Sequence, residues 1–123
     1  MARVFVIDDD QVVRRLARAI LERGGHEVVA LADGQSALAA LEQSTPDIII
    51  TDLMMPRMNG LDLLRHIRAD ARWAALPVVL LTARGTADDM RQAQEAGVSH
   101  LLTKPFSSAQ LLDEIAAFTV SRR

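Results

Sequence analysis

The sequence contains no cysteine among its 123 residues. This absence excludes a disulfide scaffold, a thiolate metal site and a cysteine nucleophile, and it leaves the redox compartment open. Lysine is almost as scarce, because a single lysine, Lys104, stands against thirteen arginines. The one position that keeps an ammonium group is therefore a candidate functional residue.

Aromatic side chains are also few, with one tryptophan, three phenylalanines and no tyrosine. The net charge is −2 and the arginines are scattered, so neither charge nor stacking side chains indicate direct nucleic-acid binding. No segment approaches the roughly 20 apolar residues of a membrane span, and the N-terminal apolar run is too short for a signal peptide. We expect no membrane partner and a cytoplasmic location.

Three apolar runs rich in β-branched residues predict strands: VFVI at 4–7, DIII at 47–50 and PVVLLT at 77–82. They lack the polar alternation of a half-exposed strand, so we expect them to be buried on both faces of a parallel sheet. Two weaker runs, HEVVAL at 26–31 and SHLLT at 99–103, complete the set.

Helical apolar spacing follows each of these runs, and we expect each apolar stripe to lie on the sheet. The first stripe comprises Val12, Val13, Leu16, Ala19 and Ile20. Three arginines on the same helix are predicted to form a solvated face, with a docking patch as the alternative: Arg14, Arg15 and Arg18. A β-α order repeated five times predicts an α/β fold, a doubly wound, five-stranded parallel sheet with five helices of the flavodoxin-like type. We assign residues 1–123 to a single domain, with no effector domain present.

Acidic residues follow two of the predicted strands, at the edge of the sheet where such folds bind ligands. Asp8, Asp9 and Asp10 follow the first strand, and Asp52 ends the third. Asp10 suits the N-cap of the helix that begins near Gln11. The other three carboxylates would raise one another's pKa unless a cation lay between them. Oxygen ligands favour a hard ion, and Mg²⁺ needs only two or three protein oxygens.

Two further polar residues, Thr82 and Lys104, end the fourth and fifth strands. One cavity would then hold a carboxylate, a cation site, a hydroxyl and an ammonium group. These groups suffice to transfer a phosphoryl group to a carboxylate. Asp52 would attack as the nucleophile, Mg²⁺ and Lys104 would neutralise charge on the phosphoryl oxygens, and Thr82 would donate a hydrogen bond.

Four segments, in this order and with suitable spacing, resemble the receiver domain of two-component response regulators: VFVIDDD, PDIIITDLMMPRMNG, PVVLLTA and GVSHLLTKPF. The resemblance covers about residues 3–118. It implies that Asp52 accepts phosphate from a phosphohistidine on a histidine kinase or histidine phosphotransfer protein. It also implies that Asp8 and Asp9 hold Mg²⁺, with Asp9 the more direct ligand, and that Met54 offers the metal its backbone carbonyl.

The same resemblance implies roles for residues on the last two strands and the loops that follow them. Thr82 would be the hydroxyl that closes on the phosphoryl group, and the small side chain of Ala83 would leave that group room. Lys104 would pair with the phosphoryl group, and its bond to Pro105 would be cis.

One position departs from the family pattern, because Leu101 stands where an aromatic residue usually precedes the lysine by three positions. Leucine offers neither a large ring nor a polar tip. We therefore predict normal phosphorylation with an altered or weaker readout on the surface formed by the fourth helix, fifth strand and fifth helix. Met54 and Arg84 are expected to tune dephosphorylation, although a solvated loop residue is an equal interpretation of Arg84.

The first hypothesis is thus a signalling module whose chemistry is limited to self-phosphorylation and slow self-dephosphorylation. One alternative is a small Mg²⁺-dependent phosphohydrolase with an aspartyl-phosphate intermediate, which normally needs a second acid where this chain has Met54. Another is a degenerate receiver that serves only as a binding module. The expected partners are the phosphodonor and either a downstream target protein or an effector domain outside this chain. The expected assembly is a monomer or a weak, phosphorylation-dependent dimer.

Overall fold

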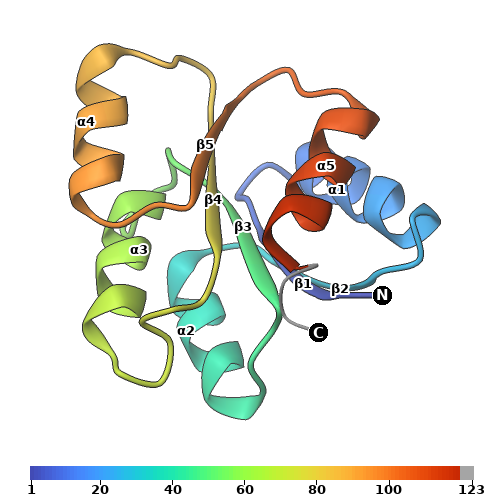
Figure 1. Ribbon diagram of the computed structural model, residues 1–123, viewed down its shortest axis with the longest axis horizontal. Helices are drawn as coiled ribbons and strands as arrows, with labels where there is room; N and C mark the ends of the chain where they lie inside the picture. The colour runs from blue at the N-terminus through green and yellow to red at the C-terminus, as the bar shows by residue number, and fades with distance from the viewer. Residues whose placement is uncertain (120–123) are drawn as a thin grey trace.

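Five parallel strands form one sheet in the order β2-β1-β3-β4-β5 in the computed structural model, which describes residues 1–119 (Figure 1). The strands are β1 (Arg3–Ile7), β2 (Glu27–Leu31), β3 (Ile48–Asp52), β4 (Val78–Thr82) and β5 (His100–Thr103). All neighbouring strands pair in parallel. The five predicted strands are confirmed, and so is their parallel arrangement.

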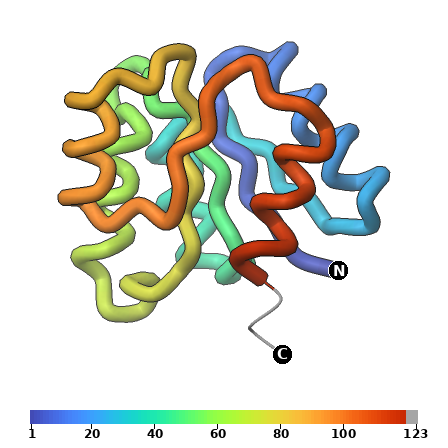
Figure 2. The backbone as a smooth tube through the Cα atoms, turned by 45° about the horizontal axis from the view of Figure 1, so that its top comes forward, coloured from blue at the N-terminus to red at the C-terminus, as the bar shows by residue number. Residues whose placement is uncertain are grey.

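Helices cover both faces of this sheet, as the tube in Figure 2 also shows. Their bounds are α1 (Gln11–Arg23), α2 (Gly34–Gln43), α3 (Gly60–Ala69), α4 (Ala87–Glu95) and α5 (Ser108–Thr119). One face carries α1 and α5, and the other carries α2, α3 and α4. Within residues 1–119, no helix is both long enough and apolar enough to cross a membrane. The last four residues of the predicted domain, 120–123, lie outside the described residues.

The central strands explain why their sequences are continuously apolar. Every residue of β3 and β4 is buried. Alternate side chains serve two cores, so that Ile49 and Leu80 pack beneath α2, α3 and α4, while Ile50 and Leu81 pack beneath α1 and α5. A strand that is buried on both faces has apolar residues at successive positions and does not alternate between apolar and polar residues.

Polar side chains cap the starts of helices, and the predicted cap Asp10 is one of them. The Asp10 side chain accepts hydrogen bonds from the backbone N–H groups of Val12 and Val13. Asn59 caps α3, and the Ser107 hydroxyl accepts a 3.0 Å bond from the N–H of Gln110 at the start of α5. These side chains satisfy N–H groups that have no partner within the helix.

The first helix departs from prediction in the face that it turns to the sheet. Its buried residues are Ala17 and Leu21, whereas Val12 is 74% exposed and Leu16 is 52% exposed. Helix α1 has apolar residues on two sides. The predicted stripe follows the side that contains the exposed Val12 and Leu16, not the side that packs on the sheet. Leu16 instead borders two apolar hollows between α1 and the segment that runs through Phe106 into α5.

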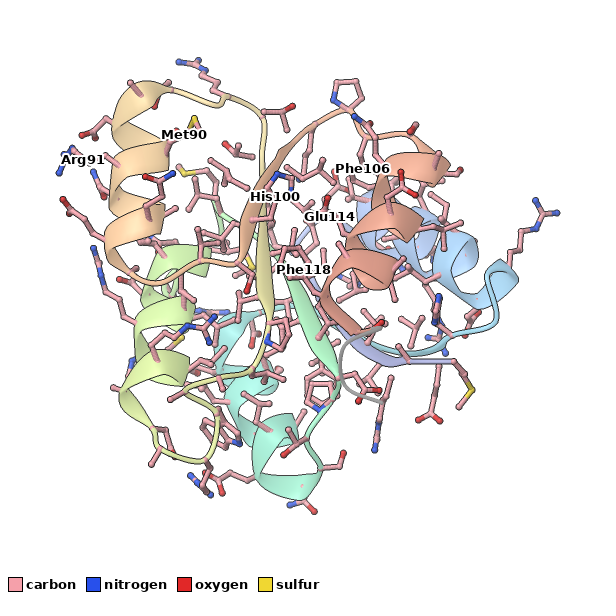
Figure 3. All side chains as sticks on the ribbon, viewed as in Figure 1. Met90, Arg91, His100, Phe106, Glu114 and Phe118 are labelled. Carbon is pink, nitrogen blue, oxygen red and sulfur yellow. The ribbon has the colours of Figure 1, made fainter. Side chains whose placement is uncertain are left out.

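The edge strand β5 directs its side chains to opposite faces, as alternation requires. Leu101 packs against the core beneath α3 and α4. His100 turns toward α5, where its Nδ1 lies 2.5 Å from a carboxylate oxygen of the buried Glu114 (Figure 3). Between α4 and β5 a hollow of about 180 Å³ is bordered by Met90, Leu101 and neighbouring residues.

Candidate phosphoacceptor site

The sheet topology brings the predicted site residues to one edge. β1 begins the chain but lies between β2 and β3, so the order of strands reverses beside it. A crevice opens at the carboxyl ends of strands where such a reversal occurs. Asp8 follows β1, Asp52 ends β3, Thr82 ends β4 and Lys104 follows β5. Residues nearly a hundred positions apart therefore share one site.

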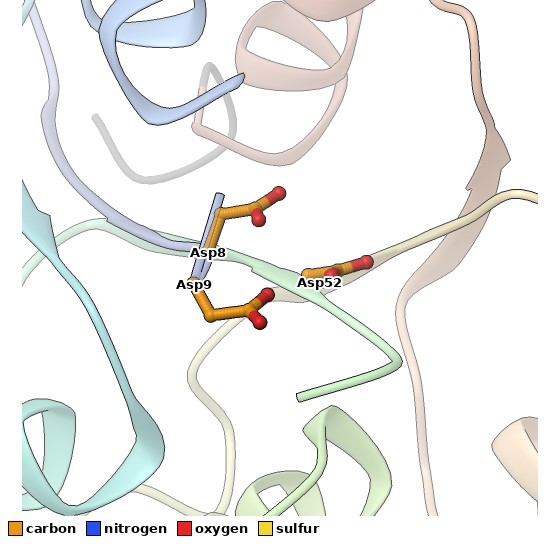
Figure 4. Close-up of side chains that lie close together, drawn as sticks. All are labelled: Asp8, Asp9 and Asp52. Carbon is orange, nitrogen blue, oxygen red and sulfur yellow. The ribbon is translucent and has the colours of Figure 1, made fainter. Parts of the chain in front are cut away.

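Three carboxylates lie close together at this edge of the sheet (Figure 4). Asp8, Asp9 and Asp52 each place a carboxylate oxygen within 4.8 Å of the other two. Asp8 and Asp52 are buried, whereas Asp9 is exposed. Like charges at this separation repel one another strongly when water is excluded. The arrangement favours a bound cation.

Lys104 supplies one positive charge to this group. Its ammonium nitrogen lies 3.1 Å from Asp52 Oδ1 and 3.2 Å from Asp8 Oδ2. The backbone helps to place it, because the N–H of Lys104 donates a 2.7 Å bond to the carbonyl of Thr82. The Lys104–Pro105 peptide bond is cis, as the resemblance implies.

The pKa values of Asp52 and Lys104 are both raised, but the balance of causes differs between them. Burial raises the pKa of Asp52, and the charge of Asp8 raises it further, while the hydrogen bond and charge of Lys104 only partly oppose these effects. Burial alone would lower the pKa of Lys104, but its bonds to Asp52 and the charges of Asp52 and Asp8 outweigh burial and raise it. The excess of negative over positive charge in the site contributes to both pKa shifts.

The turn after β1 is fastened by several hydrogen bonds. The N–H of Asp8 donates to the Leu31 carbonyl at 3.1 Å, and the N–H of Asp10 donates to Asp8 Oδ1 at 2.9 Å. The Arg14 guanidinium donates a 2.7 Å bond to the Asp8 carbonyl. The prediction of a solvated arginine face is therefore wrong for Arg14, although Arg15 is exposed as expected. The hydrogen bond from Arg14 to Asp8 depends on how the arginine side chain folds back over the turn, and helical spacing does not predict that conformation.

Thr82 is only 2% exposed, and its hydroxyl is engaged by its own loop. It donates a 2.6 Å bond to the Arg84 carbonyl and accepts a 3.1 Å bond from the Arg84 N–H. Ala83 and the Arg84 side chain are exposed next to it. Because the hydroxyl has one proton to donate, it can bond another acceptor only by releasing the Arg84 carbonyl.

The loop from β3 to α3 requires close backbone approach. A Cβ atom on Gly60 would lie 2.3 Å from the Asp52 carbonyl oxygen, so only glycine fits there. Arg57 adopts a positive φ of 68°, a region that side chains with a Cβ rarely enter. Met54 is 72% exposed. Neither the close approach at Gly60 nor the conformation of Arg57 was predicted.

Comparison with known proteins agrees with this geometry. The family model of the response regulator receiver domain matches residues 4–116. The chain therefore belongs to the response regulator receiver domain family.

Relatives of this chain differ in length. It is 37% identical over 117 residues to the DNA-binding dual master transcriptional regulator RpaA of Synechocystis sp., covering 95% of this chain and 48% of RpaA. It is 35% identical over 119 residues to protein PilG of Pseudomonas aeruginosa, covering 97% of this chain and 88% of PilG. The chain thus spans about half the length of RpaA and most of PilG.

Solved structures share the fold. The chemotaxis protein CheY4 of Vibrio cholerae superposes with a TM-score of 0.92 at 30% identity, covering 96% of this chain and 98% of that one. The receiver domain of sensor histidine kinase PA1611 from Pseudomonas aeruginosa, which has a magnesium ion coordinated in its active site cleft, gives a TM-score of 0.88 at 28% identity. The match covers 96% of this chain and 97% of that one.

Proposed function

We propose that this receiver domain accepts a phosphoryl group on Asp52 from a phosphohistidine of a histidine kinase or histidine phosphotransfer protein. The observation that supports this most strongly is the position of Asp52 between two other carboxylates and the only lysine of the chain. The phosphoryl group would then change the conformation of the domain and so signal to a downstream partner.

In the proposed reaction a carboxylate oxygen of Asp52 forms a bond to phosphorus. The bond between phosphorus and the donor imidazole nitrogen breaks, and that nitrogen keeps the electron pair. Lys104, 3.1 Å from Asp52, holds positive charge beside the phosphoryl oxygens as they arrive. The crevice needs no general base, because Asp52 has no proton to lose when it is ionised.

The acidic group fits Mg²⁺, since its carboxylate oxygens are hard ligands that lie within 4.8 Å of one another. We assign Asp9 as the most direct ligand because it is the exposed member. Asp8 would act partly through water, and Asp52 with the backbone carbonyl of Met54 would complete the set. When bound, Mg²⁺ supplies charge that offsets the negative phosphoryl oxygens.

The proposed switch begins at Thr82. Its hydroxyl would release the Arg84 carbonyl, to which it is bonded at 2.6 Å, and donate to a phosphoryl oxygen instead. The small Ala83 leaves room for that group. We expect exposed Met54 and Arg84 to affect the access of water to the acyl phosphate, and so its hydrolysis.

The readout is expected to be weak on the surface formed by α4, β5 and α5. Leu101 is partly buried against the core beneath α3 and α4, and it carries no ring or polar group that could exchange between two environments. Movement of the Thr82 loop would therefore reach this surface mainly through the backbone.

The phosphodonor is proposed to dock on the apolar hollows between α1 and α5. Their lining includes Val13, Leu16, Phe106 and Leu112, and one hollow is bordered by Lys104 itself. An apolar surface that ends at the phosphoacceptor suits a helix that carries a phosphohistidine. Leu16→Glu should slow transfer from a phosphohistidine donor while leaving labelling by acetyl phosphate unchanged. Equal slowing of both reactions would contradict this docking site.

The alternative functions are not favoured. A phosphohydrolase would need a general acid near Asp52, and the position two residues on is the exposed Met54. A degenerate receiver would lack at least one pocket side chain, whereas Asp8, Asp9, Asp52, Thr82 and Lys104 are all present. We therefore favour a signalling module over both alternatives.

The test is intact-mass measurement after incubation with Mg²⁺ and acetyl phosphate. We expect one stable phosphoryl adduct on the wild type and none on Asp52→Asn. Asp10→Asn is the matched control, because asparagine caps a helix as well as aspartate does and the site is otherwise unchanged. Rapid turnover of varied phosphate esters would indicate the hydrolase instead, and no adduct on the wild type would indicate the degenerate receiver.

A further inference from the structure

The turn from Asp8 to Asp10 carries two of the three carboxylates, yet it holds them very differently. Asp8 is fully buried, with one oxygen bonded by the N–H of Asp10 and the other 3.2 Å from Lys104. Asp9 is exposed, and among residues 1–119 no group donates a hydrogen bond to its carboxylate. The position of the Asp9 carboxylate therefore depends on the backbone that carries it.

Arg14, in the first turns of α1, donates two hydrogen bonds to the backbone of this turn. Its guanidinium donates a 2.7 Å bond to the carbonyl of Asp8, and its own N–H donates a 3.0 Å bond to the carbonyl of Asp10. The Asp8 carbonyl belongs to the planar peptide unit that leads into Asp9. A hydrogen bond to this oxygen fixes the plane of the peptide, and with it the direction in which the Asp9 side chain leaves the turn.

We infer that Arg14 is a positioning residue for the divalent cation, acting through the Asp8–Asp9 peptide. The inference rests on the proposed function, since it concerns the metal that the acidic group would bind. Groups that orient a metal ligand commonly change affinity when they are removed. The sign of the effect is diagnostic. A positive charge near the site repels a cation, so a purely electrostatic role predicts tighter Mg²⁺ binding without Arg14, whereas positioning predicts weaker binding.

The experiment measures Mg²⁺ affinity by amide chemical shifts, with no phosphodonor present. Arg14→Met keeps the apolar stem and removes the donor, and Arg14→Lys restores a charge with a single-point donor. Arg15→Met is the matched control, because it removes the same charge from the next position of α1, where the side chain is exposed. We expect Arg14→Met to raise the Kd about tenfold, Arg14→Lys to fall between it and the wild type, and Arg15→Met to match the wild type.

A second readout separates positioning from loss of fold. The rate of labelling by acetyl phosphate is followed as Mg²⁺ is increased. Arg14→Met should need more Mg²⁺ for half its maximal rate but should reach the wild-type maximum. An unchanged or lower Kd in Arg14→Met would overturn the inference, and so would a reduced maximal rate with an unchanged Kd. If Arg14→Met does not fold, the same comparison is made with Arg14→Lys.

The two proposals fail in different ways. If the wild type binds no Mg²⁺ or gains no phosphoryl group, the proposed function fails and the inference fails with it. If the wild type does both, and the Arg14 variants bind Mg²⁺ as tightly as it does, only the role of Arg14 is wrong.

Discussion

At the carboxyl end of the sheet Lys104 lies 3.1 Å from Asp52 and 3.2 Å from Asp8, while near the opposite end Arg72 lies 2.7 Å from both Glu42 and Asp70. Each cluster joins one cation to two carboxylates. The Asp8 and Asp52 side chains are 0% and 10% exposed, against 52% for Glu42. The same kinds of charge thus meet in a buried setting and in a solvated one.

The carboxylates respond in opposite directions. Hydrogen bonds from the Arg72 side chain and backbone lower the pKa of Asp70 to about 2. Burial and the neighbouring carboxylates raise the pKa of Asp52 in spite of Lys104. In the exposed cluster the Arg72 guanidinium donates to both carboxylate oxygens of Glu42 and of Asp70. It also lies 4.3 Å from the centre of the Trp73 ring. The buried cluster has three carboxylates for one ammonium group, an excess of negative charge that favours a further cation.

The largest expected effect comes from removing Lys104, the cation of the buried cluster. Lys104→Met should slow adduct formation about a hundredfold, the typical loss when a preorganised charge or donor is removed. Lys104→Arg should not restore the rate, because a broad planar guanidinium cannot take the place of a compact ammonium group that contacts both Asp8 and Asp52. Arg72→Met is the matched control and should leave the rate unchanged. Labelling kinetics by intact mass provide the measurement, and a wild-type rate in Lys104→Arg would contradict the expectation.

The next effect concerns pH. Because the pKa of Asp52 is raised on folding, its contribution to stability is greatest in acid and is lost as the pH rises through the folded-state pKa. For Asp70, whose pKa falls to about 2, the contribution is present above the ordinary value and is lost as the pH falls toward 2. Carboxyl-carbon NMR titration distinguishes the two groups.

Mg²⁺ should reduce this contrast between the pKa values of Asp52 and Asp70. The cation should lower the pKa of Asp52 and leave that of Asp70 unchanged. Without Mg²⁺, Asp52→Asn should have a higher Tm than the wild type at neutral pH, since the substitution removes a disfavoured charge. A lower Tm would mean that pairing with Lys104 outweighs burial and repulsion at Asp52.

The smallest expected effect lies at the edge strand. Leu101→Tyr should leave the labelling rate unchanged but enlarge the amide shift differences between the phosphorylated and unphosphorylated forms across α4, β5 and α5. The hollow of about 180 Å³ beside Leu101 offers space for part of the ring. Large amide shifts of equal size in the wild type and in Leu101→Tyr would show that the readout is not weakened by leucine.

The sequence allowed much of this structure to be predicted, because its strongest signals are local. Continuous apolar runs identified β3 and β4, and Asp10 identified the start of α1. The polar residues at the strand ends then followed from parallel topology.

Other features depend on contacts that no local pattern records. Helix α1 is apolar on two sides, and only packing decides that Ala17 rather than Leu16 faces the sheet. The bond from Arg14 to Asp8 and the pair formed by His100 and Glu114 are likewise tertiary contacts. Periodicity places a residue on a helix face, but it does not show what that face will meet.

The central claim, that Asp52 is the phosphoacceptor, can be tested by locating the acyl phosphate chemically. Wild-type protein is labelled with acetyl phosphate and Mg²⁺ and then treated with borohydride, which reduces an acyl phosphate to an alcohol and so converts phosphoaspartate to homoserine. Peptide mass mapping then identifies the converted residue. The account predicts homoserine at position 52 alone, and none in an unlabelled sample. Conversion at Asp8 or Asp9, or labelling with no conversion at Asp52, would contradict it.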